Sequence, residues 1–280
     1  MKISIIVPVY NRIENLKYLI YCLKRQTSQV DELIISDDGS SVDVINFLKE
    51  EIKELKCSVK YVWQEDLGFR LSRARNNGAK ISESEVLIFF DQDVIFAFNF
   101  IEVVRKNIKK GYFLPFKLYW MNEEERKNFN DDNFEYSKLK LREEELKKIK
   151  KQIIASRIKN IKYYLGLKDR GSNIVGAAFS LYKDDYIKIN GFDEEYRGWG
   201  KEDDDISWRL YKAGLKLKHI SLKYPIIHLW HYSDPSKTKG DMNENLFNQK
   251  KEKLNKNNFR CKYGYDNSYD KDEIKVIKIK

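Results

Sequence analysis

Short apolar runs alternate with stretches of helical periodicity along the first half of the chain. The apolar runs are typical of buried strands, and the helical stretches repeat their apolar residues at intervals of three and four. We predict strands at 3–7, 32–36, 59–63 and 86–90, and helices at 14–25, 42–55 and 71–81. This order predicts a mostly parallel sheet flanked by helices, an α/β fold whose ligands bind beyond the carboxyl ends of the strands.

The pattern changes in the second half. Residues 121–165 are charged, poor in strand formers and helical in spacing, and we interpret them as an insertion. Further elements follow, with a strand over 173–181, helices over 183–189 and 202–213, and a strand near 224–228. We therefore expect one domain over 1–236, made of a first part at 1–116, the insertion and a second part at 171–236, followed by a polar tail at 237–280.

Carboxylates stand where predicted strands end. Asp91 and Asp93, separated by Gln92, follow a strand, and two carboxylates at this spacing can reach one Mg²⁺ or Mn²⁺ site that also takes phosphate oxygens. An ordinary acidic turn is the alternative. Asp37 and Asp38 end another strand, where they fit a turn and are also able to accept the N–H of a base or a ribose hydroxyl.

Two other strand ends carry aromatic, basic or imidazole groups. After the first strand, Tyr10 is suited to stacking on a base and Arg12 to meeting a phosphate, although a polar loop explains both equally well. After the last strand come His228 and His231, and histidine is a common metal ligand. One packed and one surface histidine is the alternative.

The acids at 202–205 open a helix, where they complement the helix dipole. Asp203 shares a face with Ile206 and Leu210, so it is the acid we expect to point inward, while Asp204 lies about 100° away. An inward carboxylate behind Trp199 and two glycines suits a general base beside a stacked sugar.

Together these segments resemble the nucleotide-sugar glycosyltransferases of the GT-A fold, specifically bacterial family 2. The matching pieces lie at 7–12, 36–40, 68–76 and 91–93, and residues 198–205 are similar to the acceptor and catalytic motif of β-1,4-galactosyltransferases and chondroitin polymerase-type enzymes. The resemblance covers roughly 1–116 and 171–235. It implies an inverting, in-line transfer from a UDP-sugar, with hexose or N-acetylhexosamine as the donor sugar.

The resemblance also implies residue roles. The nucleotide-sugar would be bound by Pro8, Tyr10, Asn11, Arg12, Asp37, Asp38, Arg73, Asn76, Asp91 and Gln92, with Arg73 near the diphosphate. Mn²⁺ or Mg²⁺ would be held by Asp93, Asp91, His228 and His231. The acceptor, a glycan or lipid-linked glycan, would meet Trp199, Gly200, Glu202 and Asp204, and Asp203 would be the catalytic base. Lys201 departs from the motif, which often has glycine there.

The net charge of +10 suggests an anionic partner. Residues 138–162 carry ten basic and three acidic side chains, and residues 237–262 carry eight and three, which leaves the rest slightly acidic. We interpret both segments either as solvated surface or as docking surfaces for anionic lipid. Binding to nucleic acid is not expected, because it would leave the acids at 91–93 and at 202–205 unexplained. A nucleotidyltransferase would need a glycine-rich loop after the first strand, where Pro8 stands.

Cellular location follows from two weaker signals. Cys22, Cys57 and Cys261 are widely spaced, which favours reduced thiols in a cytosolic protein. The first apolar run stops at Pro8, too early for a secretory signal, and we find no run long enough to span a bilayer. We expect a cytoplasmic protein that assembles lipopolysaccharide, capsule or another surface polysaccharide, peripheral on the inner face of the cytoplasmic membrane if the basic segments bind lipid.

Overall fold

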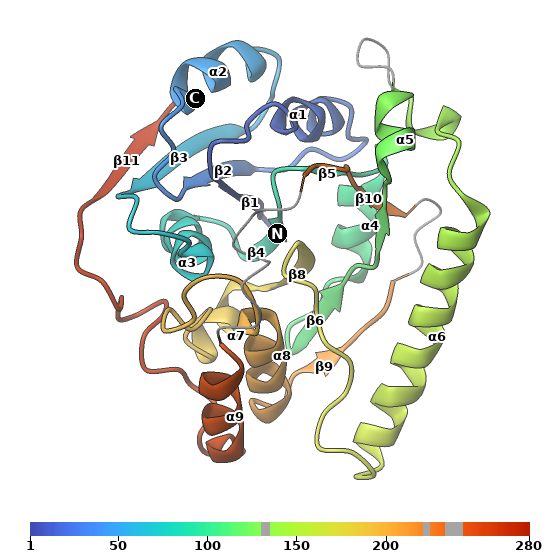
Figure 1. The fold of residues 1–280 in the computed structure, drawn as a ribbon, viewed down its shortest axis with the longest axis vertical. Coiled ribbons are helices and arrows are strands. Elements are labelled where there is room, and N and C mark those ends of the chain that lie inside the picture. Colours follow the sequence, from blue (N-terminus) through green and yellow to red (C-terminus); the bar gives the residue numbers. More distant parts are fainter. Residues whose placement is uncertain (130–134, 221–224, 233–242) are drawn as a thin grey trace.

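The computed structural model describes residues 1–129, 135–220, 225–232 and 243–280, and it is built around a sheet with the strand order β11-β3-β2-β1-β4-β8-β6-β9 (Figure 1). These strands are β1 (Ile3–Val9), β2 (Glu32–Asp37), β3 (Ser58–Gln64), β4 (Val86–Phe90), β6 (Tyr112–Pro115), β8 (Ala178–Tyr182), β9 (Lys216–Leu217) and β11 (Ile274–Lys278). A smaller sheet joins β5 (Val94–Ile95), β10 (Ile226–His228) and β7 (Leu118–Trp120) in the order β5-β10-β7.

The four strands predicted in the first half form the parallel centre of the large sheet. β1 pairs in parallel with both β2 and β4, and β2 pairs in parallel with β3. Their carboxyl ends therefore meet at one edge, as the alternating pattern predicted. Beyond β4 the sheet continues with β8, which is antiparallel to β4 and β6.

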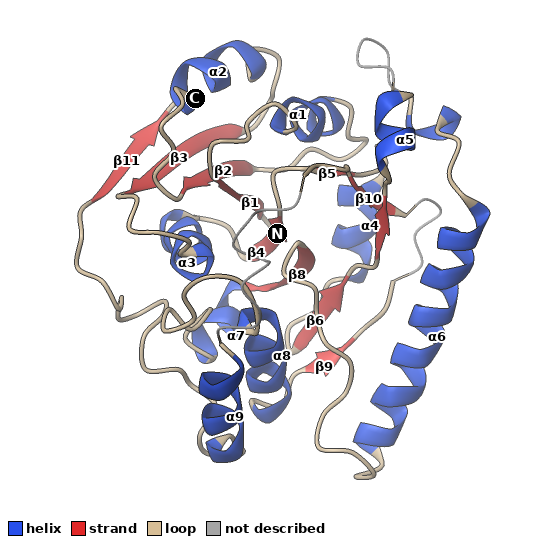
Figure 2. Ribbon diagram, in the orientation of Figure 1, coloured by secondary structure: helices blue, strands red, loops and turns tan. Residues whose placement is uncertain are grey.

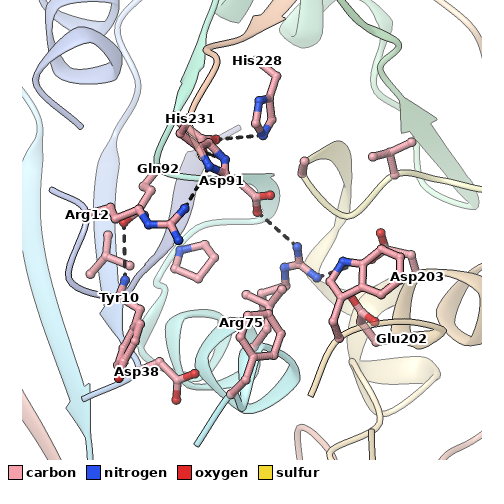
Figure 3. A pocket seen from close by; sticks show the side chains of 18 of the residues that line it. Tyr10, Arg12, Asp38, Arg75, Asp91, Gln92, Glu202, Asp203, His228 and His231 are labelled. Atoms are coloured by element: carbon pink, nitrogen blue, oxygen red, sulfur yellow. Dashed lines mark hydrogen bonds and ion pairs between the residues drawn. The ribbon is translucent and has the colours of Figure 1, made fainter. Parts of the chain in front are cut away.

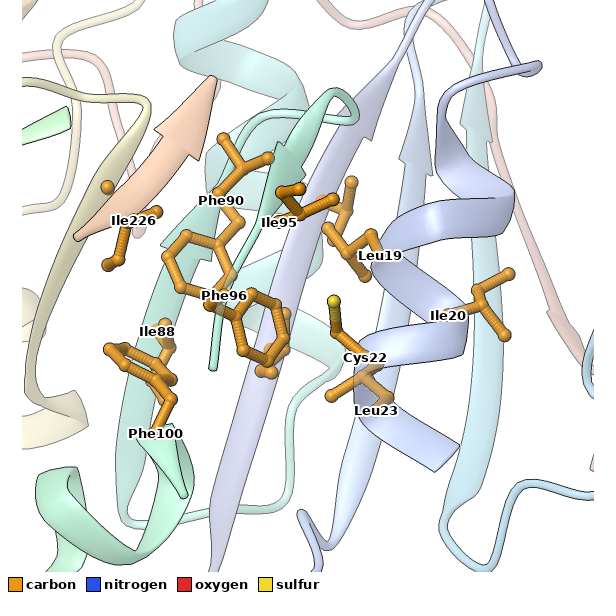
Figure 4. Close-up of a cluster of buried hydrophobic side chains, with 14 of the residues drawn as sticks. Leu19, Ile20, Cys22, Leu23, Ile88, Phe90, Ile95, Phe96, Phe100 and Ile226 are labelled. Carbon is orange, nitrogen blue, oxygen red and sulfur yellow. The ribbon is translucent and has the colours of Figure 1, made fainter. Parts of the chain in front are cut away.

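Helices cover both faces of this sheet (Figure 2). They are α1 (Leu16–Lys24), α2 (Val44–Glu51), α3 (Leu71–Ile81), α4 (Phe100–Asn107), α5 (Glu123–Lys127), the 3₁₀ turn η1 (Tyr136–Lys138), α6 (Glu143–Tyr164), α7 (Lys183–Lys188), α8 (Glu202–Lys212) and α9 (Glu244–Lys253). The larger core cluster contains Leu19 of α1, Phe90 of β4 and Phe100 of α4 (Figure 4). The second cluster contains Tyr186 of α7 and Leu210 of α8.

The strand predicted over 173–181 is shorter in the structure and begins at Ala178. The preceding backbone is held by α8 instead of by a neighbouring strand. The N–H of Ile174 donates to Oγ of Ser207 at 2.9 Å, and the N–H of Gly176 donates to Oδ2 of Asp203 at 2.8 Å. This arrangement places the segment directly beside the acids of α8.

The last residues of the chain are polar, as expected, but they also complete the large sheet. β11 pairs antiparallel with β3, with Val276 opposite Val62. Just before β11, Asp272 pairs with Arg70 at 3.0 Å and with Arg73 at 2.7 Å. This strand is not among those predicted, because most of its residues are exposed and it forms by pairing with the edge strand β3. Among the described residues, none of the helices is long and apolar enough to cross a membrane.

Candidate active site

A pocket of about 540 Å³ lies where β1 and β4 end, and Figure 3 shows its side chains. Three walls meet there: the segment after β1, the turn after β4 with β10, and the start of α8. The pocket brings together most of the predicted site residues, namely Pro8, Tyr10, Arg12, Asp38, Asp91, Gln92, Asp93, Trp199, Glu202, Asp203, His228 and His231. These residues are spread over more than 200 positions of the sequence.

The first constellation in the pocket consists of Asp93, His228 and His231. One ligand atom from each lies within 4.8 Å of the others. Nε2 of His228 is 3.3 Å from Oδ1 of Asp93, and Nε2 of His231 is 2.9 Å from Oδ2. The cluster is assembled by pairing of short strands, because His228 of β10 stands opposite Val94 of β5, directly after Asp93.

The electrostatics of this cluster favour a negative carboxylate. Burial opposes the charge on Asp93, but the two imidazoles outweigh it and lower the pKa of this carboxyl. Oδ1 of Asp93 is buried and makes no hydrogen bond within the described part of the chain. Nδ1 of His231 lies 2.8 Å from the carbonyl oxygen of Tyr232, which leaves Nε2 facing Asp93. A carboxylate with a bare oxygen and two imidazoles is a donor set that fits a divalent transition-metal ion.

Arg75 on α3 connects the side of the pocket where Asp91 and Asp93 lie with the acids of α8. Its buried guanidinium lies between Asp91 and Asp203 in Figure 3. Nη2 donates to Oδ1 of Asp91 at 3.2 Å, and Nη1 donates to Oδ1 of Asp203 at 3.4 Å. Burial opposes the charge on Arg75, but the two carboxylates outweigh it and raise the pKa of the guanidinium.

The acids of α8 form the second constellation. Burial, partly offset by Arg75 and by the N–H of Gly176, raises the pKa of Asp203. Burial and the neighbouring Asp203 raise the pKa of Glu202 to about 8. A side chain at position 176 would not fit, since a Cβ there would lie 2.1 Å from Oδ1 of Asp203. The backbone before the helix is left-handed at Gly200 and Lys201, and Trp199 just ahead of it is 41% exposed.

The remaining wall carries the residues expected to meet the nucleotide. The N–H of Tyr10 donates to Oε1 of Gln92 at 3.4 Å, which links the ends of β1 and β4. Nη1 of Arg12 lies 2.8 Å from Nδ1 of His231. Asp38 accepts the N–H of Arg70 at 2.8 Å, and burial outweighs this bond and raises the pKa of the Asp38 carboxyl to about 7. A buried carboxyl at the pocket wall can accept hydrogen bonds from a polar ligand.

Comparison with known families identifies the chain. The model described as glycosyl transferase family 2 matches residues 4–166, which is more than half of the sequence. This chain belongs to glycosyl transferase family 2. A second model, described as the N-terminal domain of galactosyltransferase, matches residues 156–232. The two matches confirm the resemblance seen in the sequence and identify the protein as an enzyme of the glycosyltransferase class.

Three individual relatives show which glycosyltransferases this chain is similar to. It is 25% identical over 254 residues to validoxylamine A glucosyltransferase of Streptomyces hygroscopicus subsp. jinggangensis, covering 77% of this chain and 52% of that protein. It is 24% identical over 235 residues to chondroitin synthase of Escherichia coli, covering 78% and 33%. It is 52% identical over 42 residues to human beta-1,4-galactosyltransferase 3, covering 15% and 11%. The chain thus spans about half or less of these relatives' length.

The fold agrees with that of a solved protein structure. The structure of S. aureus TarS 1–349 in complex with UDP-GlcNAc matches with a TM-score of 0.59 and 16% identity, covering 89% of this chain and 64% of that one. This likeness confirms the predicted α/β fold of GT-A type.

Several predicted site residues of the glycosyltransferase do not line the pocket. Asp37 accepts bonds from Oη of Tyr61 and from the N–H of Ser40, and Asn11 accepts the N–H of Ser41. The others outside the lining are Arg73, which pairs with Asp272, Asn76, which donates to Glu194 and Phe192, Gly200, whose carbonyl accepts from Asn243, and Asp204, which pairs with Arg170.

The helical wheel predicted Asp203 as the inward acid of α8, and Asp203 lines the pocket, but two other acids of this helix are buried more deeply. Glu202 is 8% exposed and Asp205 is 1% exposed, whereas Asp203 is only half-buried. Asp205 is buried because it accepts a bond from Nε of Arg209 at 2.6 Å, one turn further along the helix. A helical wheel with one buried face does not predict this, because α9 also packs against α8.

Eight residues that line the pocket were not predicted as site residues, and Arg75 and Trp120 are the two whose side chains contact predicted site residues through an ion pair or a ring contact. Arg75 lies in the matched segment 68–76, but Arg73 was chosen instead. Two residues correspond to about 200° on a helix, so the two arginines face nearly opposite sides, and the helical period could have indicated this. Trp120 ends β7 and lies against His228, with ring centroids 4.4 Å apart. It stands between the two parts of the chain that carry the resemblance, 1–116 and 171–235, where no motif pointed to it.

Proposed function

We propose that this family 2 enzyme is an inverting, metal-dependent glycosyltransferase that moves a hexose or N-acetylhexosamine from a UDP-sugar to a hydroxyl of a glycan acceptor. One observation carries the proposal. A single pocket holds a metal-type donor set at one end and the carboxyl groups of Glu202 and Asp203 at the other, with Arg75 between them. Activated-sugar transfer needs both functions within reach of one anomeric carbon, because the leaving group and the attacking hydroxyl stand on opposite sides of it.

We assign the end of the pocket that holds Asp93, His228 and His231 to the diphosphate of the donor. Asp93, His228 and His231 would hold Mn²⁺, or Mg²⁺, with Asp91 close by in its ion pair with Arg75. A bound divalent ion would neutralise charge on the UDP leaving group. Tyr10, Arg12 and Asp38 stand on the same side of the pocket and are assigned to the nucleoside and phosphates. The TarS structure that shares this fold is described as a complex with UDP-GlcNAc, which supports a uridine nucleotide here.

We assign the end of the pocket formed by Glu202 and Asp203, the α8 end, to the acceptor. Oδ1 or Oδ2 of Asp203 removes the proton of the acceptor hydroxyl, and the hydroxyl oxygen forms a bond to the anomeric carbon. The bond from that carbon to the diphosphate oxygen breaks, and UDP leaves from the opposite face, so the configuration inverts. Arg75 favours the ionised form of Asp203 before the reaction. Exposed Trp199 supplies a surface for a sugar ring, and Glu202 a hydrogen bond to a sugar hydroxyl.

The biological setting is proposed from relatives. The chondroitin synthase of E. coli and the hyaluronan synthase of Pasteurella multocida match about 78% of this chain and are named as polysaccharide synthases. We propose that this enzyme extends a surface polysaccharide, such as a capsule or lipopolysaccharide glycan, on a lipid-linked acceptor at the cytoplasmic side of the membrane. The galactosyltransferase-type model over α8 and β10 favours galactose, N-acetylgalactosamine or glucose as the sugar.

A screen of donors tests the proposal. The purified chain is given a panel of UDP-sugars and purine-nucleotide sugars, with Mn²⁺ or with a chelator, and nucleotide release is measured. We expect release from one or two UDP-sugars only, and only with the metal. Turnover that is equally fast in chelator would overturn the metal assignment, and preference for a purine nucleotide would overturn the donor assignment. Mass analysis of the product made on candidate glycans then identifies the acceptor.

A further inference from the structure

Helix α6 carries a row of apolar side chains on its outward face. Ile154, Ile158 and Ile161 of the helix and Leu165, directly after its last residue, follow one another at intervals of four, three and four, so they share one side. They are 58%, 49%, 58% and 68% exposed. We call these four residues the outer row. Contiguous apolar residues at such exposure are uncommon on a protein surface that contacts only water.

The opposite face of α6 attaches the helix to the domain. Ile149 is buried in the larger core cluster. Oδ1 of Asn160 accepts the N–H of Ser172 at 3.0 Å and the hydroxyl of Tyr211 at 2.6 Å. Oη of Tyr164 accepts the N–H of Leu217 at 3.1 Å. The helix is therefore held in place without the outer row, and Figure 1 shows it running along one edge of the molecule.

Exposed lysines flank the outer row. Lys147, Lys150, Lys151 and Lys162 project from the same half of the helix by its 100° period, and all four are exposed. Within the described part of the chain, Lys150, Lys151 and Lys162 form no ion pair with a carboxylate. Apolar residues at the centre of a face with lysines on both sides are the pattern of a helix that lies in the interface of an anionic bilayer.

We propose that α6 docks the enzyme on an anionic lipid surface, with the outer row in the boundary between headgroups and acyl chains and the lysines against lipid phosphates. The lysine stems can lie along the apolar boundary while their ammonium groups reach the headgroups. A second copy of the chain fits less well, because a twofold contact through this face would bring lysines against lysines. Nucleic acid fits less well too, because the centre of the face is aliphatic and offers no ring for stacking.

This inference rests on the proposed membrane setting and deepens it by naming the surface that docks, while sugar transfer in solution does not depend on it. The test is co-sedimentation of the whole chain with vesicles of phosphatidylcholine alone and vesicles with about one third phosphatidylglycerol. We expect binding to the anionic vesicles only, weakening as salt rises. The variant I154Q/I158Q/I161Q should bind at least roughly tenfold more weakly, because it loses most of the apolar insertion. The variant K150Q/K151Q/K162Q should also bind more weakly and lose most of the salt dependence.

Two further measurements keep the test decisive. Val276→Gln, which removes a 53% exposed apolar side chain from β11, should leave vesicle binding unchanged. UDP-sugar hydrolysis in solution should be the same in the α6 variants and the parent chain, which separates docking from folding and from the chemistry of the pocket. Full vesicle binding by I154Q/I158Q/I161Q would overturn the proposal. It would also be overturned if light scattering showed a dimer of the parent chain that this variant converts to a monomer.

Discussion

The two acidic ends of the pocket use the same functional group under opposite electrostatic conditions. At one end Asp93 faces two imidazoles, which lower the pKa of its carboxyl despite burial. At the other end Asp203 and Glu202 lie beside each other, and burial raises the pKa of both carboxyls. Arg75 reaches toward both ends through Asp91 and Asp203.

This difference separates two chemical roles. A carboxylate with a lowered pKa keeps its charge at neutral pH and is suited to holding a cation. A carboxylate with a raised pKa is a better proton acceptor in the transition state, provided that it is ionised when the acceptor binds. The burial and neighbours of each acid, and not its residue type, therefore assign its role. Mutations at each end should give different kinetic and binding phenotypes.

The largest effect is expected at the α8 end. Asp203→Asn removes the proton acceptor and should lower kcat by about 10³-fold. Calorimetric titration with UDP and Mn²⁺ should give a Kd close to that of the parent chain, because Asp203 does not belong to the predicted metal cluster. The loss should therefore fall on kcat and not on nucleotide affinity.

Asp204→Asn is the matched control for that experiment. Asp204 is the next residue of α8, but it pairs with Arg170 at 3.3 Å and does not line the pocket. Its variant should keep most of the activity. If Asp204→Asn instead lost activity while Asp203→Asn stayed active, the assignment of the base would be wrong.

The second largest effect is expected at the metal-ligand end. Asp93→Ala removes the carboxylate that both imidazoles face, and it should weaken Mn²⁺ binding by about 10- to 100-fold and UDP binding with it. Titration with Mn²⁺ alone and then with UDP measures both. His219→Gln is the control, because His219 is the histidine outside the pocket and bonds to Ser156. Equal Mn²⁺ affinity in the Asp93→Ala variant and the parent chain would contradict the proposed metal site.

A smaller effect is expected between the two ends. In Arg75→Lys one ammonium replaces a guanidinium that spans two carboxylates, so Asp203 loses part of the support for its ionised form. The pKa of Asp203 should rise, and since the base acts when deprotonated, the acid limb of kcat/KM should move to higher pH by about half a unit or more. Arg105→Lys, at an arginine that pairs with Asp31 away from the pocket, should leave the profile in place. An acid limb that does not move would contradict this role of Arg75.

The central fold could be predicted because its signals are local. Each parallel strand is a mostly apolar run, and each flanking helix shows its period in the sequence, so the order of elements determined the class of sheet. β11 could not be predicted in this way. Its five residues, Ile274–Lys278, are mostly exposed and do not alternate regularly, since Val276 and Ile277 are adjacent, so the sequence shows no buried face. Pairing with the edge of β3 makes this segment a strand.

The same contrast between local signals and long-range contacts applies to the residues of the candidate site. Asp91, Asp93 and Asp203 could be predicted because each stands at the end of a strand or at the start of a helix whose direction is known. The arginine that enters the pocket could not be chosen from motif matching alone. Arg73 and Arg75 belong to one segment, and their partners Asp272 and Asp203 lie about 200 and 130 residues away in sequence. Long-range ion pairs of this kind are a property of the tertiary structure.

The smallest effect concerns stability at the α8 end. The pKa of Glu202 is about 8 in the folded protein, above the ordinary 4.5 of glutamic acid, because of burial and Asp203. Between these values the folded state binds a proton that the unfolded state has released, so this group makes stability fall as pH rises from about 4.5 to 8.

Glu202→Gln removes this pH-dependent contribution to the free energy of unfolding. Relative to the parent chain it should gain stability with rising pH, by roughly 1–3 kcal/mol at pH 8, visible as a Tm difference of a few degrees. Glu252→Gln, at an exposed position of α9, should leave the pH dependence as it is. Parallel Tm curves for the Glu202→Gln variant and the parent chain would show that Glu202 is ionised in the fold, and the contrast between the two ends of the pocket would then rest on Asp203 alone.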